Sequence, residues 1–196
     1  DLHLWAAAAV AVVAAAGFIL SQRRPEAMVP LQLFGHPVFS AANLMTFLVY
    51  GALGAVMFLV VLQLQVTSGY GPIPAGLAAL PITIALLFLS ARFARLAQRI
   101  GPRVPMSVGP VVCAAGVVLL AQVGAEAPYV SVVLPGMVLF ALGLATLVAP
   151  LTAAVLAAAP DRHAGIASGI NNAVARSGSL LAVAALPAAV GLGARQ

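Results

Sequence analysis

Six apolar runs divide this chain of 196 residues, and each is long enough, or nearly long enough, to cross a lipid bilayer. A hydrocarbon core about 30 Å thick needs roughly 20 apolar residues in a helix. Charged residues make up only 7% of the chain and gather between the runs, which excludes a water-soluble fold. The runs are Leu4–Leu20, Leu44–Val66, Ala75–Ala91, Val104–Gly124, Val130–Ala158 and Gly165–Gly193.

The bilayer restricts the secondary structure that these runs can adopt. Because no water is present there to satisfy backbone N–H and C=O groups, only α-helices and closed β-barrels span it. Barrel strands would appear as alternating segments of about ten residues, and the sequence shows no such pattern. We therefore predict an all-α, polytopic transmembrane helix bundle with six spans.

The placement of arginine predicts the orientation of these helices. Seven Arg lie in the loops after the first, third and fifth spans, whereas the loops after the second and fourth spans hold none. Short loops rich in Arg stay in the cytoplasm, so we expect loops 21–43, 92–103 and 159–164 on the inner side of the plasma membrane. Topology therefore explains the net charge of +5, and no nucleic-acid partner is expected.

Polar side chains follow one face of the sixth span. A guanidinium near the middle of a membrane needs a wet cavity or a partner, so Arg176 is expected to line a substrate pathway or its gate. The alternative is that its side chain snorkels back to headgroup phosphates. Successive spacings of four, four and three residues put the set on one helical face: Ser168, Asn172, Arg176 and Ser179.

The second span carries another polar face near its cytoplasmic start, formed by Asn43, Thr46 and Tyr50. Two readings remain open for this face, because such residues either line a substrate pathway or form hydrogen bonds between helices. Farther along the same span, Gln63 and Gln65 are two residues apart and cannot share a face.

Proline and glycine within the spans indicate how the helices bend and pack. Pro81 and Pro150 interrupt the third and fifth spans, where each is expected to kink the helix. Small residues spaced by four or seven let helices approach closely, which predicts contact seams. These small-residue pairs are Gly51 with Ala55, Gly109 with Gly116, Gly136 with Gly143, and Gly165 with Gly169.

Reactive residues are scarce and scattered. His3, His36 and His163 lie in or near loops without a metal-binding spacing, and no His, Asp or Glu lies within a span. We therefore expect no enzyme, no metal site and no phosphate-binding glycine loop. The single cysteine, Cys113, rules out a disulfide within this chain.

Four stretches of the chain resemble segments of one known family. The segment A-R-L-A-Q-R-I-G-P-R is similar to the cytoplasmic signature loop G-x-L-A-D-R-x-G-R-R of the major facilitator superfamily, with Arg99, Gly101 and Arg103 at matching positions. Ala94 replaces the glycine and Gln98 replaces the aspartate, so the gate-latching role of that aspartate is not carried over. The other matching stretches are Pro30–Leu44, Leu62–Pro81 and Gly165–Gly178.

Together these stretches resemble the C-terminal portion of the fourteen-helix drug:proton antiporter branch of that superfamily. The resemblance implies that residues 1–20 are a helix of the pair inserted between the two transporter domains and residues 21–43 a cytoplasmic linker. Residues 44–196 would then be the first five spans of the C-terminal domain. The last helix and the N-terminal half of the polypeptide are expected outside this chain.

The same resemblance implies a function, namely proton-driven export of drugs or other amphipathic organic molecules. The proton gradient would supply the energy, and no cofactor is expected. The implied partners are the lipid bilayer, the small amphipathic substrate and the missing N-terminal half. Two alternatives stay open: a superfamily carrier for a lipid precursor, siderophore or amino acid, and a membrane-embedded protein that does not transport.

Overall fold

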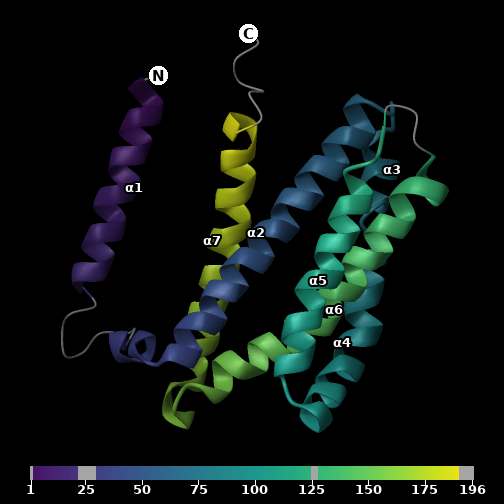
Figure 1. The fold of residues 1–196 in the computed structure, drawn as a ribbon. Coiled ribbons are helices and arrows are strands. Elements are labelled where there is room, and N and C mark those ends of the chain that lie inside the picture. Colours follow the sequence, from purple (N-terminus) through teal and green to yellow (C-terminus); the bar gives the residue numbers. More distant parts are fainter. Residues whose placement is uncertain (1, 22–29, 125–127, 190–196) are drawn as a thin grey trace.

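The computed structural model describes residues 2–21, 30–124 and 128–189, and within these ranges every regular element is helical (Figure 1). Three short helical turns connect longer helices: η1 (Leu31–Gly35), η2 (Tyr129–Val133) and η3 (Asp161–His163). The longer helices are α1 (Leu2–Ser21), α2 (Pro37–Val66), α3 (Pro72–Leu77), α4 (Leu80–Ile100), α5 (Arg103–Leu120), α6 (Leu134–Ala157) and α7 (Ala164–Ala189). The all-α prediction is confirmed.

Within the described ranges, four helical segments are long and apolar enough to cross a membrane. They correspond to the second, third, fourth and fifth predicted spans. The first and sixth predicted spans correspond to α1 and α7, which have 20 and 26 residues. The polar residues Asn171, Asn172 and Arg176 lower the hydropathy of α7. The four segments are Pro37–Val66, Pro72–Ile100, Arg103–Leu120 and Tyr129–Ala157.

The helix of the second span begins earlier than the sequence predicted. It was expected to start at Leu44, whereas α2 starts at Pro37, within the segment taken as a linker. Proline suits the first turn of a helix, because its φ is already helical and its missing N–H would have no partner there. Phe39 is fully buried in an apolar cluster and anchors this extension. The part of the predicted linker at 22–29 lies outside the described residues.

The arginine-rich segment 92–103 was predicted as a loop, but α4 continues through it to Ile100. Its Arg side chains are exposed while Ala97 is buried, so this end of the helix is amphipathic. Charged side chains mark where an apolar span reaches the edge of the hydrocarbon, but they do not end the helix. The sequence therefore predicted the end of the span and not the end of α4. The chain reverses at Gly101, whose φ of 85° is readily adopted by glycine but strained for other residues.

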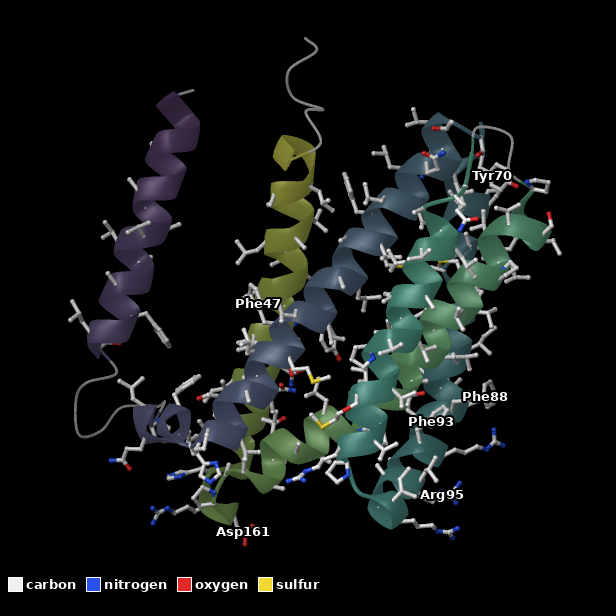
Figure 2. The ribbon with its side chains drawn as sticks, in the orientation of Figure 1. Phe47, Tyr70, Phe88, Phe93, Arg95 and Asp161 are labelled. Carbon is white, nitrogen blue, oxygen red and sulfur yellow. The ribbon has the colours of Figure 1, made fainter. Side chains whose placement is uncertain are left out.

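The two ends of the bundle carry the residues that the orientation rule assigns to them. Figure 2 shows Arg95 and Asp161 at one end of the bundle and Tyr70 at the other. Arg95 belongs to the last turns of α4, and Asp161 begins η3 between α6 and α7. The segments 92–103 and 159–164 therefore lie on the same side, as expected of two cytoplasmic connections.

Close backbone contact joins α5 to α6. A Cβ added to Gly116 would lie 2.5 Å from the backbone N of Phe140 and 2.9 Å from the carbonyl oxygen of Gly136. A Cβ on Gly143 would lie 2.6 Å from the backbone N of Cys113. Since lipid tails are as apolar as side chains, membrane helices associate through packing of this kind. The seam predicted for Gly109, Gly116, Gly136 and Gly143 is confirmed.

A second seam joins α2 to α7, at a crossing marked by Phe47 in Figure 2. A Cβ on Gly51 would lie 3.4 Å from the carbonyl oxygen of Gly178, and one on Gly54 would lie 2.9 Å from that of Ser179. A Cβ on Gly178 would meet the carbonyl oxygen of Phe47. The seam predicted at Gly51 is therefore confirmed.

The seam predicted at Gly165 and Gly169 is wrong for the described residues. Nothing lies within 4 Å of a Cβ placed on either glycine. At roughly 100° per residue, both point well away from Gly178, which marks the side of α7 that packs on α2. Small residues at the right spacing form a seam only when a second helix lies against their face.

The helix of the third span is broken beside Pro81, which lies in the first turn of α4. The backbone N of Ile82 donates to the carbonyl oxygen of Ala79 at 3.1 Å, so the carbonyl of Ala78 is not used by the helix. The hydroxyl of Tyr129 donates to that free carbonyl at 3.2 Å. A neighbouring helical segment thus satisfies a backbone group that the break leaves open, as membrane interiors require.

Pro150 is buried within α6, and the helix bends in this region. Figure 1 shows the C-terminal part of α6 running across the lower end of α2 toward the start of α7. Interior prolines bend helices because they lack an N–H and crowd the preceding turn. The bend brings apolar side chains of three helices into one buried cluster, which includes Phe39, Ala42, Leu147, Leu151, Val155 and Ala167.

We expect Gly116→Ala to destabilise the protein by about 1–3 kcal/mol, because the new methyl group would meet backbone atoms that cannot rotate aside. Thermal unfolding of the purified protein in detergent would show a lower midpoint. Gly76→Ala is the matched control, since nothing lies within 4 Å of a Cβ there and its midpoint should not fall. Equal midpoints for Gly116→Ala and the parent protein would contradict a seam that needs glycine.

Candidate functional site

Beyond their crossing, α2 and α7 diverge (Figure 1). A groove of about 780 Å³ is lined by residues of these two helices and of the start of α4. We name it the α2/α4/α7 groove. Its volume is in the range of pockets that hold small organic ligands. The lining residues are Leu53, Gly54, Met57, Phe58, Val61, Leu62, Gln65, Ala79, Ile82, Thr83, Ser179 and Val183.

The chemistry of the α2/α4/α7 groove is apolar with a few neutral polar groups. Gln65, Thr83 and Ser179 are its polar side chains, one from each of three helices, and no lining residue is charged. Met57 and Phe58 add a flexible thioether and an aromatic ring to the wall. Such a lining accommodates a ligand with a large apolar body and a small number of hydrogen-bonding groups.

The polar stripe predicted on α7 leads from this groove toward the cytoplasmic end. At roughly 100° per residue, Ser168 and Asn172 each lie about 20° around the helix from Ser179, and Arg176 lies about 60° from it. Asn172 and Arg176 are exposed, and Ser168 is half-buried. The structure therefore puts three predicted site residues on or beside the face that lines the groove.

On α2, Tyr50 lies on the same helical face as Met57, which lines the α2/α4/α7 groove. It lies seven residues before Met57, which corresponds to about 20° around the helix. Its side chain is half-buried, so part of the ring is accessible. Tyr50 therefore extends the groove face of α2 toward the helix crossing.

The other two predicted residues on α2 are engaged in packing instead of lining a groove. Thr46 is 1% exposed, and its hydroxyl lies within hydrogen-bond distance of two acceptors, the Oδ1 atom of Asn171 on α7 at 2.9 Å and the carbonyl oxygen of Ala42 in its own helix at 3.0 Å. Asn43 is 4% exposed, and its Nδ2 donates to the carbonyl oxygen of Phe39 at 2.9 Å. For Thr46 the structure therefore supports hydrogen bonding between helices, one of the two readings left open by the sequence.

Asn171 forms a contact between helices that the sequence reasoning missed. It is 8% exposed and lies on the side of α7 that packs on α2. A signal was present, because Ala167, Asn171, Ala175 and Gly178 are spaced four, four and three residues apart. A stripe of small residues interrupted by one amide marks a helix-contact face with an internal hydrogen bond.

The signature loop lies at the turn between α4 and α5. Ala94 is half-buried, Gln98 and Arg99 are exposed on α4, and Arg103 begins α5. Gly101 occupies the left-handed conformation that makes the tight turn possible. The sequence holds no Asp or Glu between residues 30 and 124, so no carboxylate from this region substitutes for the aspartate that Gln98 replaces.

A second groove, of about 480 Å³, lies between α2 and α5 near the turn that Tyr70 marks in Figure 2. Its polar side chains already have partners. The amide of Gln63 donates to the carbonyl oxygen of Val123 at 3.4 Å, and the hydroxyl of Thr67 donates to Gln63 at 3.3 Å. Gln63 and Gln65 thus line different grooves, which confirms that they cannot share a face. We take the α2/α4/α7 groove as the candidate site, because the amide of Gln65 in its wall has no hydrogen-bond partner among the described residues.

Metal chemistry finds no support in the described part of the chain. No group of three or more His, Cys, Asp or Glu side chains lies together there in a way that could hold a metal ion.

Apolar helices long enough to span a membrane, packed together through glycine seams, define a multi-pass membrane protein. The chain belongs to the Major Facilitator Superfamily, which it matches over residues 3–183. It is accordingly a multi-pass protein of the cell membrane.

Several relatives of this chain are antibiotic resistance proteins. The lincomycin resistance protein of Streptomyces lincolnensis is 32% identical over 90% of this chain and 36% of its own length. The multidrug resistance protein Stp of Mycobacterium tuberculosis is 33% identical over 93% of this chain and 33% of its own length. The tetracenomycin C resistance and export protein of Streptomyces glaucescens is 30% identical over 95% of this chain and 35% of its own length. The chain thus spans about a third of the length of these curated relatives.

Thr46→Val should lower the free energy of unfolding by about 1 kcal/mol, because it leaves the Oδ1 atom of buried Asn171 without its donor. Chemical or thermal unfolding in detergent measures the loss. Thr152→Val is the control, since that hydroxyl donates only within its own helix, to Val148 at 3.0 Å, and its removal should cost less. Altered substrate preference with unchanged stability in Thr46→Val would instead favour a pathway role.

Proposed function

We propose that this chain forms one wall of a proton-driven exporter of amphipathic organic molecules. The observation that carries the proposal is the α2/α4/α7 groove, an apolar surface with three neutral polar side chains contributed by three helices. The relatives named for resistance to lincomycin, to multiple drugs and to tetracenomycin C support the same reading. Because the chain covers about a third of those proteins, the activity belongs to a larger assembly.

The groove also indicates what kind of substrate the exporter takes. It offers no charged side chain, so a bulky apolar or weakly polar molecule fits it better than a sugar phosphate or an amino acid. The opposite wall of the pathway would come from the N-terminal half of the same polypeptide, since secondary transporters bind substrate between two bundles. The lipid bilayer is the remaining partner.

Along this pathway we propose a role for Arg176 and its neighbours. Ser168, Asn172 and Arg176 would flank the route from the groove to the cytoplasm, with Tyr50 on the facing helix. The guanidinium of Arg176 would attract or orient polar groups of the substrate along this route.

Proton coupling requires a group that changes protonation as it is exposed to the two sides of the membrane. Asp161 is the one carboxylic acid among the described residues, and it lies in η3 between α6 and α7. We therefore propose that the coupling carboxylate belongs to the N-terminal half of the transporter. The energy source is the proton gradient, with no cofactor and no enzymatic step.

Inside-out vesicles that contain the intact protein should accumulate an amphipathic dye when a proton gradient is imposed, and should stop when a protonophore collapses the gradient. Vesicles without the protein set the background. The 196-residue chain alone, reconstituted in proteoliposomes, should give no saturable dye movement. Gradient-independent accumulation by the intact protein, or saturable transport by this chain alone, would overturn the proposal.

Gln65→Leu should change the relative transport of substrates that differ in hydrogen-bonding groups, because it removes a neutral polar group from the α2/α4/α7 groove. We expect the KM for a polar substrate to rise several-fold while the KM for an apolar dye changes little. Gln63→Leu is the matched control on the same helix, in the other groove, and should leave both KM values unchanged. If Gln63→Leu and Gln65→Leu behave alike, the groove is not the substrate wall.

A further inference from the structure

Four exposed arginines gather where α4 ends and α5 begins. Arg92, Arg95 and Arg99 follow one another on α4, and Arg103 is the first residue of α5. The three on α4 fall within an arc of about 60° and extend over roughly 10 Å of helix rise. They point away from buried Ala97, and Figure 2 shows Arg95 at this end of the bundle. We name the four residues the arginine patch.

The arginine patch has no carboxylate partner in the part of the chain that the structure describes. Asp161 is the one acidic residue in those ranges, and residues 30–124 contain no Asp or Glu at all. Gln98, which is exposed beside Arg99, is neutral. Exposed guanidinium groups that follow one another along one end of the bundle repel one another unless anions bind near them, so the patch favours an anionic ligand.

The surroundings of the patch indicate which anion it meets. Leu96, Ile100 and Val104 are exposed by 42%, 48% and 50%, and they alternate with the arginines at the end of two membrane-spanning segments. Apolar side chains at this depth enter the acyl region while neighbouring guanidinium groups reach the phosphates. Guanidinium also binds phosphate oxygens in pairs, which suits a phospholipid headgroup.

We propose that the arginine patch binds the headgroups of anionic phospholipids in the cytoplasmic leaflet. Clusters of four or more basic residues directly inside a membrane span attract such lipids. An acidic protein segment would match the charge equally well, but it would leave the interleaved Leu96, Ile100 and Val104 without an apolar environment. The inference concerns the lipid partner and does not depend on the transported substrate.

Native mass spectrometry of the intact protein, exchanged into mixed vesicles of phosphatidylcholine and phosphatidylglycerol, tests this inference by comparing how much of each lipid is retained. The parent protein should retain phosphatidylglycerol preferentially, and each single Arg→Gln change in the patch should lower that preference about fivefold. Arg→Lys at the same positions should keep only part of it, since the charge remains but the paired hydrogen bonds to phosphate are lost. Arg162→Gln is the control outside the patch and should retain the parent preference.

Arginine also helps to orient membrane helices, so a variant that changes all four residues can fail to insert. A salt titration of the parent protein avoids that problem, because added salt should reduce retention of phosphatidylglycerol and leave that of phosphatidylcholine unchanged. Equal retention of the two lipids by the parent protein would overturn the proposal. So would a phosphatidylglycerol preference that persists in the Arg→Gln variants, or a loss of thermal stability in those variants in pure phosphatidylcholine, which would indicate an acidic protein partner.

Discussion

Close backbone contact between helices is the interaction on which this bundle depends. Within a bilayer, apolar side chains gain little by leaving lipid for another helix, so helix association must come from dense packing and hydrogen bonds. The α5–α6 seam achieves that density by bringing Gly116 and Gly143 against the backbone of the facing helix. The α2–α7 seam does the same at Gly54 and Gly178. The remaining features, including the groove, are arranged around these two rigid pairs.

The helices of the bundle pack closely at one end, whereas α2 and α7 diverge toward the other end. At the cytoplasmic end, the bent C-terminal part of α6 adds Leu151 and Val155 to a buried apolar cluster, and Thr46 bonds Asn171 across the α2–α7 crossing. Beyond the crossing the helices diverge, and the α2/α4/α7 groove occupies the space between them. The uncharged groove therefore lies in the part of the bundle where α2 and α7 no longer pack on each other.

Hydropathy was enough to predict the helices, four of which are long and apolar enough to cross a membrane, and arginine placement predicted that 92–103 and 159–164 lie at the same end of the bundle (Figure 2). Both patterns follow from the cost of placing polar groups in hydrocarbon. They could not predict that α2 begins at Pro37 or that α4 runs to Ile100, since the edge of the bilayer and the end of a helix are set by different interactions. Nor could they pair Thr46 with Asn171, because that contact depends on where two helices cross. The groove residues Gln65, Thr83 and Ser179 come from three different helices. The local sequence of one helix does not predict where it diverges from another.

The bond between the hydroxyl of Tyr129 and the carbonyl of Ala78 has a mechanical consequence. A break in a helix is ordinarily a soft joint, able to flex through a range of small angles. Here the joint between α3 and α4 is bonded to the segment that leads into α6. Small deflections are therefore resisted, and a larger one must break the bond outright. A movement of α4 relative to α6 at this joint therefore requires the bond between Tyr129 and Ala78 to lengthen or break.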